Sequence, residues 1–323
     1  MCTAISFKQK DHYFGRNLDL DRGNAEQITI TPRNYPFSFR NGLVKKTHYA
    51  MIGMATIAQE YPLYYEATNE KGLSMAGLNF PGEARYQVRI AGKDNIAPFE
   101  LIPWVLGQCE SVNEAMQLLQ KTSVWMLPFS REYLLTPLHW MICDREHCMV
   151  AEPVADGLKL YDNPAHVLTN SPCFPYHMHR LSDFSRLDPF SSCSGFCSIP
   201  VQSYSAGQGA IGLPGDFSSV SRFVRAAFVR ANSSICTENT ETASHFFHLL
   251  NAVAMPKGSI LMENGNPEIT LYSCCCNTDK GIYYYNTYAN SRISAVHLQH
   301  CNLEDRHLTT FPLRNFPEVF HQN

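Results

Sequence analysis

The sequence predicts an α+β fold in which β-sheets are stacked and helices cover their outer sides. Segments typical of strands open the 323-residue chain, a helical segment follows, and further strands and helices complete it. Because a sheet or helix with one apolar side must bury that side against another element, this order favours stacked sheets with helices outside. Neither a linker nor an internal repeat interrupts the chain, so we expect a single domain over residues 1–323.

The first predicted element is a β-hairpin. In CTAISF the residues alternate, so that Cys2, Ala4 and Ser6 share one face of a strand. A turn-like KQKD follows, and YFGRNLDL then has the composition of a second strand. The first strand therefore begins at the second residue of the chain.

The middle of the chain contains one well-marked helix and several short strands. Ser111 and Glu114 fit a capping box ahead of AMQLLQK, whose apolar residues recur with helical spacing. Short strands are expected in MICDREHCMVAEPV, GLKLYDN and HVLTNSP.

The last third predicts two helices and three strands. The helices are VSRFVRAAFVRA and TASHFFHLLNAVAM, the second stopped by Pro256. ITLYSCCCNTDKGIYYYNTY reads as strand, turn and strand, and SRISAVHL as one more strand. Residues 182–209, before these helices, are rich in Ser, Gly and Pro. Since so long a loop is usually functional or interfacial, we expect a subunit contact or part of a substrate mouth there.

Charge and apolar patterning favour a small-molecule partner. The chain is 17% charged with a formal net charge of -3, which provides no electrostatic attraction for nucleic acid or an anionic membrane. No signal-peptide core and no apolar run of about 18 residues is present, so we expect a cytoplasmic protein. Gly207 to Gly212 match a dinucleotide-binding pattern, but Pro214 breaks the helix that this pattern requires, which predicts a plain glycine-rich turn.

The twelve cysteines do not form a recognisable metal site. Paired C-x-x-C motifs are missing, and neither Cys143 with Cys148 nor Cys193 with Cys197 has a second half. We therefore expect buried structural thiols, also in the run Cys274 to Cys276, and neither metal nor cofactor. A cysteine-rich metal-binding or redox protein remains the rival from another class.

Cys2 is a candidate nucleophile if Met1 is removed. An N-terminal cysteine carries a thiol and an α-amine on one residue, and the amine can act as the general base. In the hairpin, Arg16 and Asp19 would lie beside it, where Arg16 could lower the thiol pKa and Asp19 could hold the ammonium.

Five motifs carry a family resemblance. MCTAI, FGRNLDLD, NEKGLSMAGLNFPG, HVLTNSP and GLPGDFSSVSRFVR together resemble the choloylglycine hydrolases, N-terminal nucleophile amidases that include bile salt hydrolases and penicillin V acylases. The resemblance extends from Cys2 to about residue 298. It implies a four-layer αββα sandwich, no cofactor, and a homotetramer that uses the region of residues 182–209 in its contacts.

The resemblance also assigns the site, residue by residue. In chain order the matching positions are Cys2 (nucleophile), Arg16 (beside the thiol), Asp19 (on the α-amine), Asn79 and Asn170 (at the oxyanion) and Arg222 (the arginine of SRF). Periodicity alone does not distinguish Arg222 from Arg225 or Arg230. The implied reaction is thiolate attack on an amide, followed by hydrolysis of a thioester.

Asn79 points to conjugated bile salts, because many penicillin acylases of the family have tyrosine there. Penicillin V remains the alternative substrate, and a member that only binds bile acids is a third reading. Candidates for an apolar steroid pocket are Leu18, Leu20, Tyr64, Tyr65, Leu127 and Phe129. The segment Arg22, Gly23 and Asn24 is more polar than in many relatives, which leaves the preference for glycine or taurine conjugates open.

Overall fold

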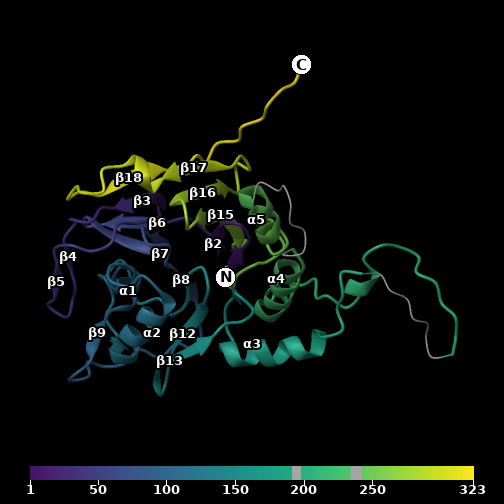
Figure 1. Cartoon of the computed structure of the whole chain (residues 1–323), viewed down its shortest axis with the longest axis horizontal. Coiled ribbons are helices and arrows are strands. Elements are labelled where there is room, and N and C mark those ends of the chain that lie inside the picture. Colours follow the sequence, from purple (N-terminus) through teal and green to yellow (C-terminus); the bar gives the residue numbers. More distant parts are fainter. Residues whose placement is uncertain (191–197, 234–241) are drawn as a thin grey trace.

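Two antiparallel sheets form the centre of the protein (Figure 1). The computed structural model describes residues 1–190, 198–233 and 242–323. In spatial order the first sheet contains β14 (Val167–Leu168), β1 (Cys2–Lys8), β2 (His12–Leu20), β15 (Ile269–Asn277), β16 (Ile282–Thr287) and β17 (Ser294–His297). The second contains β13 (Gly157–Asp162), β12 (Cys148–Val154), β11 (Leu138–Cys143), β8 (Ser74–Asn79), β7 (Tyr61–Asn69), β6 (Met51–Ala58), β3 (Gln27–Thr31) and β18 (Thr309–Pro312).

Helices cover the outer face of each sheet. On the first sheet, α4 (Ser219–Ser233) packs against β1, and α5 (Thr242–Asn251) packs against β2 and β15. On the second sheet, α1 (Leu101–Leu106) packs against β7 and β8, and α2 (Val112–Lys121) against β13. The order of layers is helix, sheet, sheet, helix, which confirms the predicted α+β sandwich (Figure 1).

The hairpin at the start of the chain has the predicted form. Residues pair in continuous register from Cys2 opposite Leu18 to Lys8 opposite His12. Gly15 is required where β2 meets β15, because a Cβ atom built there would lie 2.0 Å from the carbonyl oxygen of Cys274. This close approach keeps β2 in the middle of the first sheet, with its neighbouring residue Arg16 fully buried.

The remaining predicted elements are largely confirmed. Ser111 caps α2 by accepting a hydrogen bond from the backbone N–H of Glu114, and the strands of residues 141–163 and 269–297 are present. In HVLTNSP only Val167 and Leu168 pair as a strand. The helix before Pro256 already ends at Asn251.

Two helices were not predicted from the sequence. All six residues of α1 are buried, so it has no polar face and no helical alternation of apolar and polar residues. The other, α3 (Phe174–Leu181), is short and follows directly after the strand segment HVLTNSP. Both helices depend on contacts with other parts of the chain, which cannot be predicted from the local sequence.

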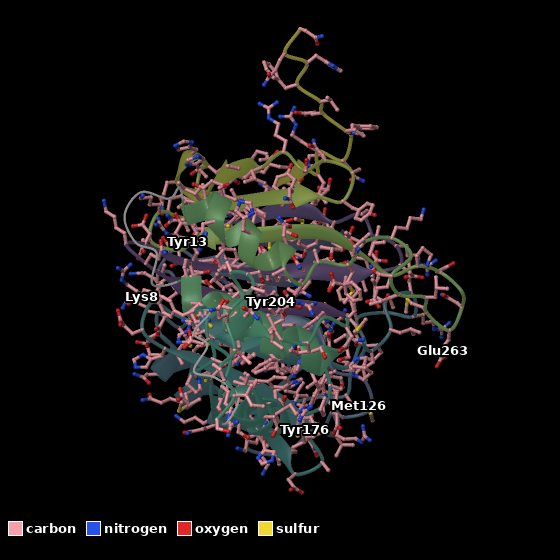
Figure 2. The ribbon with its side chains drawn as sticks, turned by 90° about the vertical axis from the view of Figure 1, so that its right-hand side faces the viewer. Lys8, Tyr13, Met126, Tyr176, Tyr204 and Glu263 are labelled. Atoms are coloured by element: carbon pink, nitrogen blue, oxygen red, sulfur yellow. The ribbon has the colours of Figure 1, made fainter. Side chains whose placement is uncertain are left out.

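The segment between α3 and α4 projects away from the body of the protein (Figure 1). Figure 2 turns this side toward the viewer and labels Tyr204, whose exposed fraction is 82%. Of the loop predicted over residues 182–209, residues 191–197 lie outside the described part. Gly207 and Gly212 have positive φ angles of 83° and 97° around a short 3-10 turn at Gln208–Ala210, so the glycine-rich stretch is a turn, as predicted.

None of the helices in the described ranges is long and apolar enough to cross a membrane. Most of them are amphipathic elements that cover a sheet, and the longest of them, α4, has buried residues only near its beginning. The buried residues of α4 include both Arg222 and Phe223.

Buried histidines predict that the fold loses stability in mild acid. Burial lowers the pKa of His12, His166 and His177 to about 4, against 6.5 for an unburied histidine. Between pH 6.5 and 4 the unfolded chain therefore binds protons that the folded chain does not, and the free energy of unfolding falls as the pH is lowered. The change His12→Gln removes one of these groups. We expect its stability deficit against wild type, measured by urea unfolding at pH 7, 6, 5 and 4.5, to shrink as the pH falls; a constant deficit would contradict the assignment.

Candidate active site

The β1–β2 hairpin places Cys2 and Arg16 on one face of the first sheet. Cys2 lies opposite Leu18, and Arg16 lies opposite Ala4, so the two side chains are diagonal neighbours facing the second sheet. Cys2 is 3% exposed and Arg16 is fully buried. The Nη1 atom of Arg16 donates to the carbonyl oxygens of Gly77, at 2.6 Å, and Tyr65, at 3.2 Å. Arg16 thus connects the nucleophile candidate to the second sheet.

Glu66 is the buried counter-charge of Arg16. Its Oε2 lies 3.8 Å from Nε of Arg16, and its two oxygens accept hydrogen bonds from the hydroxyls of Tyr272, at 2.8 Å, and Tyr283, at 2.6 Å. Burial acts against the charge of Arg16, but the neighbouring Cys2, Tyr272 and Glu66 raise the pKa of Arg16 above its ordinary value. A permanent positive charge therefore lies beside Cys2.

Asp19 faces the helix side of the same strand. Its Oδ1 accepts a hydrogen bond of 2.6 Å from the hydroxyl of Thr270, whereas its buried Oδ2 has no hydrogen-bond partner among the described residues. Burial raises the pKa of Asp19, against the effect of Arg222 and of the terminal amine. Met1 is present, and its amine donates to the backbone oxygen of Asp19 and to the carboxylate of Glu268.

Arg222 joins the start of the chain to Asn170. Its Nη1 donates to the carbonyl oxygen of Cys2, at 2.6 Å, and to the hydroxyl of Thr3, at 2.7 Å. Its Nη2 donates to Oδ1 of Asn170, at 2.7 Å, and the backbone N–H of Cys2 donates to the same oxygen, at 2.9 Å. Arg225 instead donates to the backbone of Ala252 and Pro214, so the neighbouring arginine serves a different contact.

Asn170 also reaches the strand that ends at Asn79. Its Nδ2 donates to the backbone oxygen of Asn79, at 2.7 Å. Since Oδ1 already accepts from Cys2 and Arg222, the Asn170 amide is held in one orientation with its nitrogen toward Asn79. The structure thus brings together all six residues that the sequence singled out, Cys2, Arg16, Asp19, Asn79, Asn170 and Arg222, although they come from β1, β2, β8, α4 and the loop after β14.

The six pocket candidates do not lie together. Leu18 belongs to the same core cluster as Cys2, with Leu20 and Tyr65 packed against it. Tyr64 lies in the other core cluster, on the opposite face of β7, because consecutive residues of a strand point to opposite sides. It shares a hydrogen bond of 2.7 Å with the hydroxyl of Thr31.

The two candidates from VWMLPFS, Leu127 and Phe129, belong to neither of these two core clusters. Phe129 makes ring contacts with Tyr61, Phe99 and Tyr133, and Leu127 lies partly buried in the loop before it. Tyr64 and Phe129 are thus buried among other side chains, and the role of all six candidates in a substrate pocket stays a prediction.

Sequence reasoning missed Glu66 and Thr270, the polar partners of Arg16 and Asp19. A carboxylate inside the strand YPLYYEATN was the available signal for Glu66, since a charged residue in a buried strand must be paired. Asn24, in the polar segment after β2, donates to the Tyr65 hydroxyl at 3.4 Å, so this segment borders one of the predicted pocket residues.

The cysteines of β15 are buried thiols. Burial raises the pKa of Cys274 and Cys275 well above the ordinary value and that of Cys276 to about 12. In the ranges that the structure describes, no group of three or more His, Cys, Asp or Glu residues could hold a metal ion. The chemistry available at Cys2 is therefore that of a thiol beside an arginine, with amide donors close by.

Similarity to known proteins extends over almost the whole chain. The model of the linear amide C–N hydrolases, choloylglycine hydrolase family, matches residues 2–311. A bile salt hydrolase/transferase of Lactiplantibacillus plantarum is 46% identical over 324 residues, which is 100% of both chains. One from Clostridium perfringens is 38% identical over 333 residues, again 100% of both chains.

Solved structures have the same fold. The C2A mutant of the conjugated bile acid hydrolase from Clostridium perfringens has a TM-score of 0.93 at 35% identity, over 100% of both chains. The penicillin V acylase from Agrobacterium tumefaciens has a TM-score of 0.76 at 16% identity, covering 98% of this chain and 94% of its own, and so shares the fold. Because the family model and the relatives cover almost the whole sequence, the chain belongs to the linear amide C–N hydrolases of the choloylglycine hydrolase family.

Proposed function

We propose that this protein hydrolyses the amide bond of bile salts conjugated to glycine or taurine. The observation that carries the proposal is the contact of the Cys2 backbone with Asn170 and Arg222, which puts a thiol, an oxyanion donor and a buried cation at the start of β1. The full-length similarity to proteins named bile salt hydrolase/transferase supports the substrate class.

Removal of Met1 precedes the catalytic reaction and turns the backbone N–H of Cys2 into an α-amine. Asp19 is the proposed partner of that amine, because its buried Oδ2 has no hydrogen-bond partner among the described residues. The α-amine accepts the proton of the Cys2 thiol, and the resulting thiolate, which lies beside the positive charge of Arg16, attacks the amide carbonyl carbon of the substrate.

Asn170 is the proposed donor to the oxyanion. Its Nδ2 has two hydrogens, and one of them is used by the backbone oxygen of Asn79, so the second can bind the developing negative charge. When the C–N bond breaks, the α-amine of Cys2 protonates the leaving glycine or taurine. Water then attacks the thioester, releases the bile acid and restores the thiol.

Penicillin V is the alternative substrate, since the same groups would cleave any linear amide that fits. We favour bile salts because Asn79 has the residue type of bile salt hydrolases in the resemblance above, and because the two relatives with the full-length matches carry that name. The word transferase in those names extends the proposal: the Cys2 thioester would also pass its acyl group to an amine instead of water.

Cys2→Ser tests the nucleophile. We expect a fall of at least about 10³-fold in the release of glycine and taurine from glycocholate and taurocholate, because a serine hydroxyl is far less acidic than a thiol. Intact mass of the same samples reports whether Met1 has been removed. Unchanged release in the mutant would exclude Cys2, and release from penicillin V alone would transfer the proposal to the alternative substrate.

Arg222→Lys tests the link between the start of the chain and Asn170. A lysine cannot reproduce the fork that contacts Cys2, Thr3 and Asn170 together, so we expect kcat/KM for glycocholate to fall about 10²-fold. Arg225→Lys, three residues further along the same helix, is the matched control and should stay within about 3-fold. Equal losses in both variants would mean that the helix, rather than the contact, is responsible.

The cytoplasm stays our expectation for the compartment.

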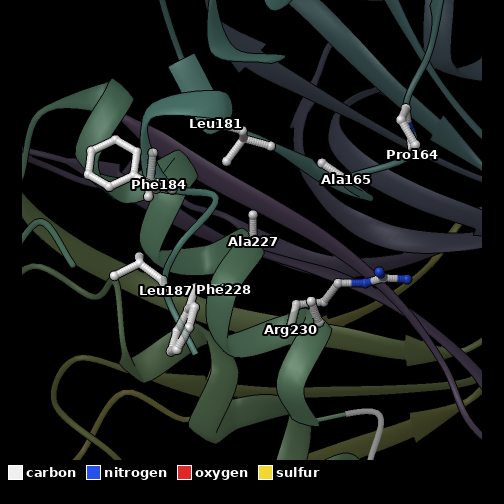
Figure 3. Close-up of a pocket in the computed structure, with 10 residues that line it drawn as sticks. Pro164, Ala165, Leu181, Phe184, Leu187, Ala227, Phe228 and Arg230 are labelled. Atoms are coloured by element: carbon white, nitrogen blue, oxygen red, sulfur yellow. The ribbon is translucent and has the colours of Figure 1, made fainter. Parts of the chain in front are cut away.

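We also propose that copies of this chain associate through the projecting segment between α3 and α4. Phe190, Ile199 and Tyr204 are all more than half exposed there. At the base of the segment a cavity of about 250 Å³ opens between Leu187 and Phe228 (Figure 3). Such apolar surface on an extended loop fits a contact between copies of the chain.

Tyr204→Glu tests this contact. We expect a smaller species than wild type in light scattering after size exclusion, because a buried unpaired charge opposes association. Tyr176→Glu, at an exposed position of α3, is the control and should leave the mass unchanged. A wild-type protein that is monomeric at all concentrations would end the proposal of a tetramer.

A further inference from the structure

Two buried histidines hold the backbone beside Asn170. Nε2 of His139, on β11, lies 3.0 Å from the carbonyl oxygen of Thr169, and Nε2 of His177, on α3, lies 2.8 Å from that of Asn170. Because a carbonyl oxygen can only accept, Nε2 carries a hydrogen in both rings. The backbone N–H of Asn170 donates to the Ser219 hydroxyl at 2.9 Å. The polar backbone groups around Asn170 are therefore held by side chains from one strand, β11, and two helices, α3 and α4.

Glu152 orients the first of these histidines. Its Oε1 lies 3.0 Å from Nδ1 of His139, and both side chains are completely buried. Since Nε2 already donates to Thr169, the contact at Nδ1 contains one shared proton, on the ring or on the carboxyl group. Glu152 also accepts the backbone N–H of Phe174, at 2.9 Å, and so connects β12 to the start of α3.

The His139 ring also contacts the segment of the other asparagine. Phe80, the residue after Asn79, stacks on it with ring centroids 4.2 Å apart and planes 7° apart. Phe80 is itself fully buried. A single ring therefore touches both chain segments that meet in the hydrogen bond between Asn170 and Asn79.

We propose that His139 and Glu152 are positioning residues, which keep the Asn170 amide where it can bind the oxyanion. The role rests on the proposed amide hydrolysis, and neither residue touches the substrate. It follows from geometry: the Asn170 side chain already holds contacts to Cys2, Arg222 and Asn79, so a shift of its backbone would move the donor from the oxyanion. Misplacement by about 1 Å at such a site typically costs about 10²-fold in rate.

Two reagents distinguish a misplaced oxyanion donor from a general loss of structure around Cys2. Acylation of Cys2 by p-nitrophenyl acetate passes through an oxyanion, whereas alkylation by iodoacetamide is a displacement at carbon without one. Glu152→Leu removes the contacts to His139 and Phe174 at similar volume. We expect it to slow acylation at least about 10-fold while alkylation stays within about 2-fold, and to lower kcat for glycocholate with little change in KM.

Glu152→Gln is the conservative rescue. Its amide nitrogen, in the place of Oε1, can donate to Nδ1 of His139, while its oxygen, in the place of Oε2, accepts from Phe174, whose N–H lies 3.2 Å from that atom. We therefore expect acylation within about 3-fold of wild type. His12→Leu is the matched control, because it removes another buried histidine that contacts two side chains, Ser6 and Thr278, at the far end of the hairpin. It should change acylation and alkylation equally.

The outcomes are distinguishable from failure of the proposed function. If wild type releases neither glycine nor taurine but Glu152→Leu still loses acylation selectively, the substrate is wrong and the positioning stands. Equal loss of acylation and alkylation in Glu152→Leu, or a Glu152→Gln variant as slow as Glu152→Leu, would overturn the positioning. Should Glu152→Leu not fold, Phe80→Leu, which removes only the stacked ring, must show the same selective loss of about 3-fold or more.

Discussion

The buried guanidinium of Arg222 is the contact on which the arrangement around Cys2 depends. It donates to the Cys2 carbonyl, the Thr3 hydroxyl and the Asn170 side chain, so it ties α4, the first strand and the loop after β14 into one unit. Burial lowers the pKa of Arg222, and Asp19 and Cys2 oppose that effect. Because a hydrogen bond to a charged group typically contributes about 1.5–3 kcal/mol, the packing of α4 and the position of the nucleophile candidate are coupled.

The alternation of β2 divides the polar groups between two sides of the sheet. Arg16 points between the sheets, where Glu66 and backbone oxygens surround it. Asp19 points toward the helices, where Thr270 and the charge of Arg222 are its partners. The thiol side of Cys2 and its backbone nitrogen therefore have different charged neighbours, Arg16 with Glu66 between the sheets and Asp19 with Arg222 on the helix side.

Residues that looked alike in sequence were separated by the fold. Tyr64 and Tyr65 are adjacent, but β7 turns one toward α1 and the other toward the core around Cys2. Arg222 and Arg225 lie one turn apart on α4, yet only Arg222 reaches the Cys2 backbone. The helix α1, entirely apolar and buried, had no periodic signal at all. In each case the deciding factor is which layer the residue meets, and local pattern does not contain that information.

The sequence by itself determined the hairpin, the helices with caps or amphipathic spacing, and the six site candidates. Alternation, capping residues and family motifs each depend only on residues that are close together in the chain. Only the tertiary structure decided how those candidates connect. Glu66 became the partner of Arg16 across the two sheets, and His139, held by Glu152, became the partner of the Thr169 carbonyl oxygen. The physical reason is that a buried charge or carbonyl needs a partner in space, and the partner's distance along the sequence places no limit on that choice.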